Sequence, residues 1–498
     1  MKSLLEVEKN RISYHKFYNK KTVQRSSLTV PNFSFCNVSI SFLNHFLIKR
    51  GYKNVACKIS AIDNKGLLID SITIQVAKPI VYNLELNEFF LAHKEKINYF
   101  IIEFFSEKNL FIPFPAVMIN HYNNNFCNVV HSYNRILNDI FEDDKNSIVV
   151  PESSFEKKID KNHDTFFNFS TGIFDFKNKI NICYQNSKKK ISKNINVNLS
   201  RLNNKSFYIS KIFNKKKLNE EGFLKISQPK QSLFYSRMLA GIINKKKKSF
   251  SANHTFYDSS EHKEYFLSKK SSKTYPFFNG FLNKIIMYPI MSEGKFNLII
   301  KIYRNKNSIF TKKYFFNSKQ KKVLDININK IVDEIDLKEI DAFTVEAISK
   351  KKIPTRVNHQ LIYGSLNKKI NLKSSINVSL NNKEIFRPKN KKGFKWGQII
   401  CGKKYESRIG ITSSIVRDED LKTQKLKIKI YNETGKIKSF TKNIKPFSAI
   451  RLDLNKLIKI KKKTEIIWYS IESDMPNLSA YSFHMNKNTK FSSGEHSF

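Results

Sequence analysis

The segment NHTFYDSSEH, residues 253–262, combines residue types that bind a divalent metal. His254, Asp258 and His262 offer two imidazoles and a carboxylate at spacings of four and four. Such groups are common ligands of zinc and related ions. The spacing suits one face of a helix, whereas the surrounding pattern predicts a strand followed by a loop. A divalent metal site is one hypothesis, and a hydrogen-bonded histidine at a strand end is the favoured alternative.

Histidines also recur at intervals close to the length of a small domain. His131, His254 and His359 each lie in a predicted strand, and Tyr481 takes the matching place in the last part of the chain. We interpret these four residues as one position of an internal repeat. The replacement by tyrosine favours a half-buried hydrogen-bonding role over a metal ligand. Arg135, four residues after its histidine, would then belong to a polar pocket mouth where sandwich loops cluster.

Two further features allow ligand binding. Tyr257 is one of several aromatic residues that lie close to these positions and would stack on a sugar, although a core-facing aromatic is the simpler interpretation. The terminal GEHSF places Glu495 and His496 side by side before an aromatic residue. A docked segment is expected here, with a binding or catalytic site as the alternative.

Common enzyme signatures are missing from the sequence. It contains no GxGxxG, no GxxxxGK[ST], no GxSxG and no HExxH. The loops and helices that bind nucleotides, carry a serine nucleophile or hold a protease zinc are therefore not indicated. No catalytic residue and no cofactor is predicted apart from the divalent metal considered above, and a non-enzymatic role is favoured.

The charge of the chain is strongly positive. The 89 lysines and arginines against 42 acids give a formal net charge of +47, which is typical of proteins with polyanionic partners. Only twelve of these cations are arginine, the residue that pairs best with phosphate and guanine. The lysine runs are dispersed along a chain also rich in Asn, Ile and Phe, all of which have AT-rich codons. Codon bias and solubility are the favoured explanation, and nucleic acid is the less favoured partner.

Cysteine usage and hydropathy indicate the cellular compartment. The five cysteines have no CxxC or CxxxC spacing, so they are expected to be free and buried. The first residues show no apolar core followed by a cleavage site, and no run of eighteen apolar residues occurs. We therefore expect a cytoplasmic protein without a membrane span, although export without a cleaved signal would leave no trace in this pattern.

A diverged internal repeat is the most informative feature. Residues 301–303 and 429–431 share the letters KIY, and Leu324-Asp325 matches Leu452-Asp453 at the same offset of 128. The box L-[DE]-[LI]-N occurs at 84–87, 324–327 and 452–455, and SFYISKIF takes its place in a weaker fourth copy. The sequence therefore predicts about four units, possibly paired as 30–265 and 275–498.

Each unit is expected to be built of strands. Segments of five to nine residues alternate or run apolar, are rich in Ile, Val, Phe and Tyr, and end at Asn, Gly, Asp or Lys turns. Short helical turns are expected only at 85–95, 327–340 and 454–460. The predicted fold is all-β, a tandem array of antiparallel β-sandwiches. The expected boundaries are an N-terminal extension 1–30, sandwiches at 31–139, 166–270, 275–365 and 396–498, and linkers at 140–165 and 366–395.

A family resemblance follows from units three and four. Strands followed by S-[DN]-x-P and a further strand, as in Glu472-Ser473-Asp474-Met475-Pro476, resemble the small β-sandwich of the sensory-rhodopsin-transducer type. About 55 residues carry the resemblance. It implies a sandwich that forms symmetric oligomers and binds a partner or small ligand without catalysis. The fourfold repetition and the basic charge depart from that family, so no partner and no binding residue is transferred.

Together these patterns predict a non-enzymatic repeat protein that binds a ligand or a protein partner and serves in assembly. A glycan or other anionic polymer is one possible ligand, and a homo-oligomer is a further option. Two alternatives stay open. One is a metal-dependent enzyme acting on a glycan-like substrate, and the other is a nucleic-acid-binding protein, which would require a continuous basic stripe.

Overall fold

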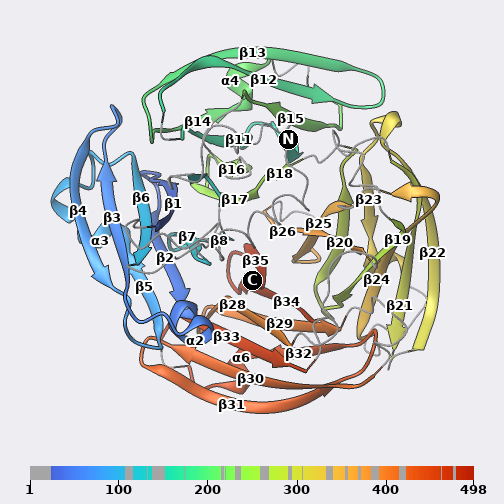
Figure 1. The fold of residues 1–498 in the computed structure, drawn as a ribbon. Helices are drawn as coiled ribbons and strands as arrows, with labels where there is room; N and C mark the ends of the chain where they lie inside the picture. Colours follow the sequence, from blue (N-terminus) through green and yellow to red (C-terminus); the bar gives the residue numbers. More distant parts are fainter. Residues whose placement is uncertain are drawn as a thin grey trace. The chain divides into compact units, whose positions relative to one another are not determined.

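The computed structural model shows an all-β protein of tandem antiparallel sandwiches. It describes residues 24–106, 116–131, 133–136, 152–172, 174–214, 218, 220–229, 237–257, 268–289, 294–304, 307–332, 340–353, 357–367, 372–382, 392–413, 422–460, 462–474 and 478–498. The chain divides into two compact units. Unit 1 contains 1–124 and 129–262, and unit 2 contains 125–128 and 263–498. Each unit contains two sandwich repeats (Figure 1).

Repeat 1 is formed by two facing sheets with interleaved chain order. The first sheet has the order β4-β3-β6-β1-β9 and the second has β5-β2-β7-β8. The strands are β1 Gln24–Pro31, β2 Asn37–Leu43, β3 Val55–Ile62, β4 Leu68–Gln75, β5 Val81–Glu85, β6 Tyr99–Ser106, β7 Met118–Tyr122, β8 Cys127–His131 and β9 Arg135–Ile136.

Repeat 2 has the same connectivity. Its sheets are β13-β12-β15-β10-β18 and β14-β11-β16-β17. The strands are β10 Glu152–Glu156, β11 His163–Ser170, β12 Phe176–Gln185, β13 Lys190–Leu199, β14 Asn204–Tyr208, β15 Phe223–Ser227, β16 Leu239–Asn244, β17 Ser249–His254 and β18 Phe256–Tyr257.

Repeat 3, in unit 2, repeats this order as β22-β21-β24-β19-β27 and β23-β20-β25-β26. The strands are β19 Ser268–Pro276, β20 Leu282–Met287, β21 Lys295–Arg304, β22 Asn307–Asn317, β23 Leu324–Asn327, β24 Ala342–Ile353, β25 Asn358–Gly364, β26 Ser374–Ser379 and β27 Asn381–Asn382.

Repeat 4 has sheets β28-β33-β30-β31 and β32-β29-β34-β35. The strands are β28 Gly393–Cys401, β29 Tyr405–Ser413, β30 Gln424–Asn432, β31 Gly435–Ile444, β32 Ala449–Asp453, β33 Glu465–Ser473, β34 Leu478–Asn486 and β35 Ser492–His496. The other repeats have a ninth strand that pairs with their first strand. At this place in repeat 4, the backbone N–H of Phe498 donates a hydrogen bond to Trp396 O of β28 over 2.9 Å.

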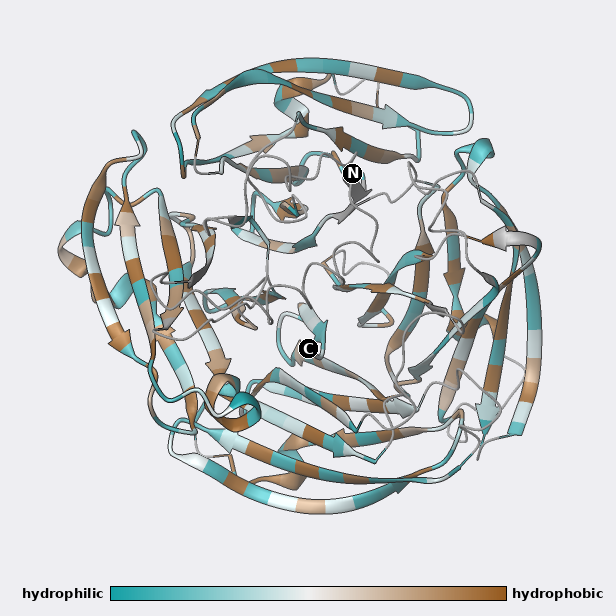
Figure 2. Ribbon diagram, viewed as in Figure 1, coloured by the Kyte–Doolittle hydropathy of each residue, from teal (hydrophilic) through white to brown (hydrophobic). Residues whose placement is uncertain are grey.

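Alternating hydropathy places the core of each sandwich between its two sheets. Along β30, Leu426, Ile428 and Ile430 are buried, whereas the lysines between them face outward (Figure 2). The same period is visible in β21, where Leu298 and Ile300 are buried. The fold class predicted from the sequence is thus confirmed, and its physical cause is this two-residue period.

Short helices follow the fifth strand of each repeat. They are α3 Leu86–Phe89, α4 Ile209–Ile212, α5 Ile328–Ile331 and α6 Leu454–Leu457, with the 3-10 turn η1 Leu91–His93 after the first. A further helix, α2 His45–Arg50, follows β2 and was not predicted, and a 3-10 turn η5 Ser318–Gln320 follows β22. The helical turns predicted at 85–95, 327–340 and 454–460 are confirmed by α3, α5 and α6. α4 was not predicted as a helix, although it follows the place that the sequence analysis gave to the weak fourth copy of the box.

The sequence alignment of the box in repeat 3 is wrong by two residues. The helix-capping residues Asn327 and Asp453 occupy the same place, since each accepts a hydrogen bond from the backbone two residues later at 3.1 Å. Ile326-Asn327-Ile328-Asn329, and not Leu324-Asp325-Ile326-Asn327, therefore matches Leu452-Asp453-Leu454-Asn455. Repetition of Ile and Asn within this segment permits both alignments, and only the helix cap decides between them.

Both predicted linkers contain strands. β10 and part of β11 lie within 140–165, and β26, β27 and the start of β28 lie within 366–395. Their polar composition suggested loops, but β10 and β27 pair with central neighbours through backbone groups, which need no apolar side chains. β1 likewise begins inside the expected extension 1–30, at Gln24.

All five cysteines are free and buried, as expected from their spacing. Within the described ranges, no helix has the length and apolar character needed to cross a membrane.

Candidate functional site

His131 and His254 are neighbours in unit 1. Each ends the fourth strand of a second sheet, β8 or β17, and the two buried rings meet edge to face with centroids 4.7 Å apart. Nδ1 of His254 lies 3.0 Å from the carbonyl of Thr255. Burial, with Arg237 and Arg135 nearby, holds the pKa of His131 well below its usual value. His131 is therefore neutral at pH 7, beside two arginines.

Of the other predicted residues, Arg135 lies in β9, is buried and lies close enough to His131 to lower the pKa of that histidine. In unit 2, His359 lies in β25, and its Nε2 is 2.7 Å from the hydroxyl of Tyr275. Tyr481 lies in β34 and is fully buried, which raises its pKa. His359 and Tyr481 thus form part of the core of unit 2.

The interpretation of His131, His254, His359 and Tyr481 as one repeat position is wrong. His131 and His254 lie in the fourth strand of their sheets, whereas His359 and Tyr481 lie in the third strand, β25 or β34. His496, which ends β35, is the residue of repeat 4 that matches the first two. The signal was present as HSY at 131–133, HTF at 254–256 and HSF at 496–498, whereas the roughly similar spacing of His131, His254, His359 and Tyr481 led to the wrong strand.

The C-terminal segment is docked in unit 2, as expected. The N–H of Ser497 donates to Ala480 O over 2.8 Å, and the Phe498 ring lies parallel to Trp468 with centroids 6.3 Å apart. Glu495 is fully buried, and Nδ1 of His496 lies 2.9 Å from the carbonyl of Ser497.

The proposed metal ligands cannot be assembled from the described part of the chain. Asp258 and His262 lie outside the described residues, and the side chain of Tyr257 is not among those described. The metal hypothesis built on His254, Asp258 and His262 therefore stays a prediction.

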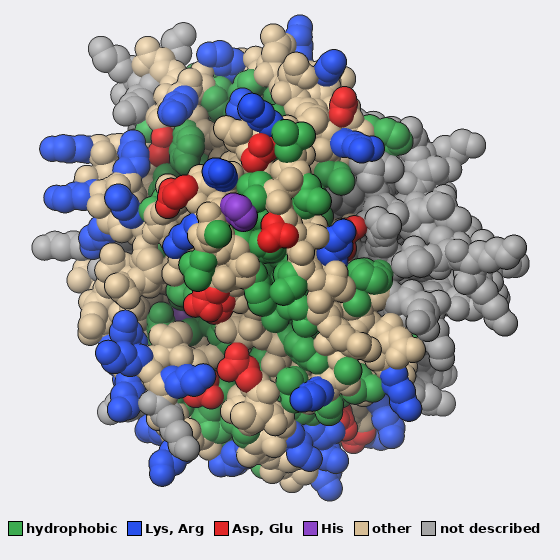
Figure 3. All heavy atoms as spheres, turned by 90° about the vertical axis from the view of Figure 1, so that its left-hand side faces the viewer, with side chains coloured by type: hydrophobic (Ala, Val, Ile, Leu, Met, Phe, Trp, Pro, Cys, Tyr) green, Lys and Arg blue, Asp and Glu red, His purple; other side chains and the backbone are tan. Residues whose placement is uncertain are grey.

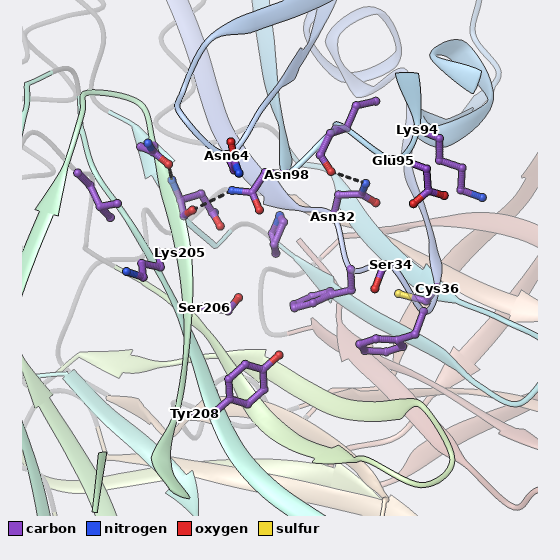
Figure 4. Close-up of a pocket in the computed structure, with 17 residues that line it drawn as sticks. Asn32, Ser34, Cys36, Asn64, Lys94, Glu95, Asn98, Lys205, Ser206 and Tyr208 are labelled. Carbon is purple, nitrogen blue, oxygen red and sulfur yellow. Dashed lines mark hydrogen bonds between the residues drawn. The ribbon is translucent and has the colours of Figure 1, made fainter. Parts of the chain in front are cut away.

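A different part of unit 1 contains an open polar pocket of about 630 Å³ (Figure 4). We call it the inter-repeat pocket, because loops of repeat 1 and β14 of repeat 2 line it. Repeat 1 contributes the β1–β2 loop, the β3–β4 turn and the segment before β6, and repeat 2 contributes β14 and the turn before it. The lining residues are Pro31, Asn32, Phe33, Ser34, Phe35, Cys36, Asn64, Lys94, Glu95, Ile97, Asn98, Leu199, Asn203, Asn204, Lys205, Ser206 and Tyr208.

Side-chain amides dominate the polar lining. Asn32 donates from Nδ2 to Ile97 O over 2.9 Å, and Asn98 donates from Nδ2 to Asn204 O over 3.4 Å across the two repeats. Behind the wall, Asn204 exchanges amide hydrogen bonds with Asn168 at 2.6 and 2.7 Å. These buried amides fix the wall, because each carries both a donor and an acceptor that must be satisfied.

Aromatic rings support the pocket from beneath. The Phe33 ring contacts Phe166 and Phe250 of repeat 2 edge to face, with centroids 5.9 and 5.3 Å apart. Phe35 also contacts Phe250, and Phe166 lies next to Tyr208. This cluster holds the two repeats together within unit 1, so the pocket has a rigid apolar base beneath its polar walls.

Unit 2 contains the equivalent junction between repeats 3 and 4. Thr29 of β1 meets Ser170 of β11 through their hydroxyl oxygens at 2.8 Å, and Thr412 of β29 donates to Thr274 O of β19 over 3.0 Å. Pro31 and Pro276 end the two corresponding first strands. The same faces of the sandwiches therefore meet in both units.

The strand register then identifies the counterpart of Ser206. Ser170 pairs with Asn204, and Thr412 pairs with Ala449. Two residues further along these strands lie Ser206 in β14 and Arg451 in β32. Ser206 therefore occupies in unit 1 the position that an arginine occupies in unit 2.

Arg451 bridges the junction in unit 2. Its Nη1 donates to Phe277 O over 3.2 Å and to Ile340 O over 2.8 Å, and its Nη2 lies 3.3 Å from Asp341 Oδ1. The corresponding segments of repeat 1, around Asn32 and Asn98, line the inter-repeat pocket. Replacement of a long guanidinium side chain by a serine hydroxyl leaves room at this junction for a ligand.

The pocket lining has few charged or reactive side chains. Its charged side chains are Lys94, Lys205 and Glu95, and its thiol is Cys36. Burial raises the pKa of Cys36 to about 12, so this thiol is protonated at neutral pH and is a poor nucleophile. Among the described lining residues, no histidine or second carboxylate stands beside Glu95 to form an acid–base pair.

Sequence reasoning missed this pocket because its residues come from separate loops with no motif. A signal was available in the repeat itself. Pro31-Asn32-Phe33 matches Pro276-Phe277-Phe278, so a polar amide replaces an aromatic at one junction.

Comparisons with known proteins give weak similarities. No family model matches the chain, and no curated protein matches it. Among solved structures, the chain is similar to a calcium-binding mutant of Bacteroides uniformis β-glucuronidase 2 at 8% identity and a TM-score of 0.12, covering 49% of this chain and 27% of that one. The chain thus spans about a quarter of that enzyme.

Two repeat proteins give similar scores. A tetra-tandem repeat from the extending region of a large adhesion protein covers 89% of this chain and 91% of its own at 8% identity, with a TM-score of 0.10. Two B repeat units of the Staphylococcus aureus collagen-binding protein cover 93% and 99% at 9% identity, with a TM-score of 0.12. These scores are too low to bear on function.

Proposed function

We propose that this protein is a non-enzymatic binding protein whose inter-repeat pocket binds a hydroxyl-rich ligand of the glycan class. The observation that carries the proposal is that Ser206 stands where the equivalent junction of unit 2 has Arg451. It leaves a pocket of about 630 Å³, a size typical of small-ligand sites.

The lining matches the hydrogen-bonding needs of a sugar. Each hydroxyl of a sugar both donates and accepts, as does each of the five lining asparagine amides. Figure 4 shows Asn98, Ser206 and Asn32 around the pocket, with Tyr208 at its lower side. A phenol beside amide groups provides an apolar surface next to polar partners, which suits the alternating faces of a pyranose ring.

The charge of the lining favours a glycan with an acidic group. Lys94 and Lys205 are exposed, and Glu95 is the lining acid. Ammonium groups at the rim attract a carboxylate or sulfate while the asparagines contact hydroxyls. The anionic glycan predicted from the sequence is therefore the ligand class that we propose, with a neutral glycan as the alternative to be tested.

The decisive experiment compares Ser206→Arg with the wild type on a panel of neutral and acidic glycans. The arginine reproduces the residue of unit 2, so it should fill the pocket, at the loss of the hydrogen bond that Asn168 donates to Ser206. An unchanged melting temperature establishes that the variant folds. We expect wild-type binding to acidic glycans and at least a tenfold loss in Ser206→Arg. Ser192→Arg on the exposed strand β13 adds the same charge outside the pocket and serves as the matched control.

Two outcomes would contradict the proposal. Equal glycan binding by Ser206→Arg and the wild type would place the ligand elsewhere. Binding that follows only the number of negative charges, and that disappears with salt in the wild type and Ser206→Arg alike, would indicate a nonspecific polyanion interaction of the lysine-rich surface.

A further inference from the structure

The four repeats have equivalent outer hairpins that differ sharply in charge. These hairpins are β3–β4, β12–β13, β21–β22 and β30–β31, and the second strand of each forms an edge of its sheet. Residues 176–199 carry six lysines, 295–317 five lysines and one arginine, and 424–444 six lysines and one glutamate. Residues 55–75 carry two lysines and two aspartates. Three hairpins are therefore strongly positive, and the first is neutral.

Lysine on an edge strand prevents unwanted pairing with another strand. An edge leaves backbone N–H and C=O groups open, and a bulky charge beside them opposes edge-to-edge association. β13, β22 and β31 all carry lysines, such as Lys193, Lys312 and Lys438. β4 has none in its sequence LIDSITIQ, and its one charged residue is Asp70. The protection present on three equivalent edges is missing from β4.

The β4 edge also exposes apolar side chains. Leu67 and Leu68, where the strand begins, are 61% and 60% exposed, and Ile72 and Ile74 are half-buried at the margin of the core. In Figure 3, which shows the left-hand side of Figure 1, hydrophobic and acidic side chains lie among lysines and arginines. The β3–β4 hairpin itself is neutral in a chain of net charge +47, so it presents little repulsion to a second copy.

We infer that β4 is a self-association edge, which pairs antiparallel with β4 of a second copy of this chain across a two-fold axis. An axis at Ile72 places Ser71 opposite Thr73 of the second copy and Asp70 opposite Ile74 of that copy. The two Asp70 carboxylates then avoid direct opposition, which would be unfavourable. The two first sheets become continuous, and the half-buried isoleucines gain cover.

Self-pairing is open to this edge and not to the three equivalent edges. Like-charged lysine edges repel one another, so β13, β22 and β31 cannot pair with their own copies, whereas the neutral β4 can. Such an interface is closed by its two-fold axis and stops at the dimer. No residue of β4 lines the inter-repeat pocket, so the inference does not depend on ligand binding.

Light scattering after size-exclusion chromatography tests the inference over a roughly hundredfold range of concentration. The wild type is expected to approach twice the chain mass of 58.4 kDa at the upper end. Ser71→Lys/Thr73→Lys supplies the lysines that the equivalent edges carry and is expected to remain a monomer throughout. Both positions are exposed, and an unchanged circular dichroism spectrum and melting temperature establish that the variant folds.

Asn194→Lys/Asn196→Lys on the exposed face of β13 is the matched control and should dimerise like the wild type. Higher salt should leave the dimer intact or strengthen it, because salt screens the net positive charge. A wild type that stays monomeric at every concentration overturns the inference. So does a dimer that survives both lysines on β4, or one that dissociates as salt is added, since the last would indicate β4 pairing with a lysine-rich edge.

Discussion

Tyr275 and His359 are joined by a hydrogen bond of 2.7 Å between the phenol oxygen and Nε2, in the buried core of unit 2. Nδ1 of the same imidazole lies 3.1 Å from Val357 O, an acceptor, so Nδ1 carries the proton and the tyrosine donates to Nε2. The bond connects β19 of one sheet with β25 of the other. A neutral histidine is thereby built into the sandwich.

Acid should destabilise unit 2 through this histidine. Burial lowers the pKa of His359 to about 3, whereas an unfolded histidine titrates near 6.5. The unfolded chain therefore binds the proton first, and stability is retained above about pH 6.5 and falls as pH decreases toward 3, by up to about 1.4 kcal/mol per pH unit. Urea unfolding followed by tryptophan fluorescence measures this in unit 2, since both tryptophans lie there.

His359→Gln should weaken that pH dependence by about one proton. Glutamine keeps a donor and an acceptor but does not titrate. His93→Gln provides the control, because His93 is only half-buried, and it should leave the pH dependence of unit 2 unchanged. An unchanged slope in His359→Gln would mean that other groups, such as His484 with its pKa of about 4, account for the acid sensitivity of unit 2.

Arg451→Ala should destabilise unit 2 by about 1–3 kcal/mol. The change removes donors from the carbonyls of Phe277 and Ile340, and a carbonyl that loses its partner in a buried junction carries a cost of that size. The tryptophan signal in urea again measures the effect. Lys442→Ala, on the exposed face of β31, removes a cation without such contacts and should change stability by less than about 0.5 kcal/mol. Equal effects would argue against a bridging role.

Asn168→Ala should destabilise unit 1 by about 1–3 kcal/mol. Asn168 is buried and bonds to Asn134, Asn204 and Ser206 at 2.6–2.9 Å, so its removal leaves several polar groups without this partner. Calorimetry resolves the expected loss. Asn194→Ala, which breaks an exposed amide pair with Asn181 at 2.8 Å, should have little effect. A small loss for Asn168→Ala would show that water replaces the network.

The sequence was sufficient for the fold but not for the pocket, and the reason is physical. Strand period is a local property, so KLKIKIYN at 425–432 predicts β30 directly. Junction geometry depends on residues far apart, such as Asn32, Asn98 and Ser206, which no local pattern connects. The comparison of histidines failed because spacings that were only similar aligned His359 with His254, although the two residues lie at different strand positions of their sheets.

Phe498→Ala should loosen the docked C-terminal segment and expose both tryptophans. The ring lies between Trp396 and Trp468, with centroids 5.8 and 6.3 Å away. Each aromatic contact contributes about 0.5–1.5 kcal/mol beyond area burial, so unit 2 should lose about 1–3 kcal/mol and its fluorescence should shift to longer wavelength. Phe315→Ala removes a phenylalanine of the same unit that is 57% exposed and should leave both signals nearly unchanged. If instead Phe498→Ala behaves like Phe315→Ala, the backbone bonds of β35 and Phe498 alone hold the segment in place.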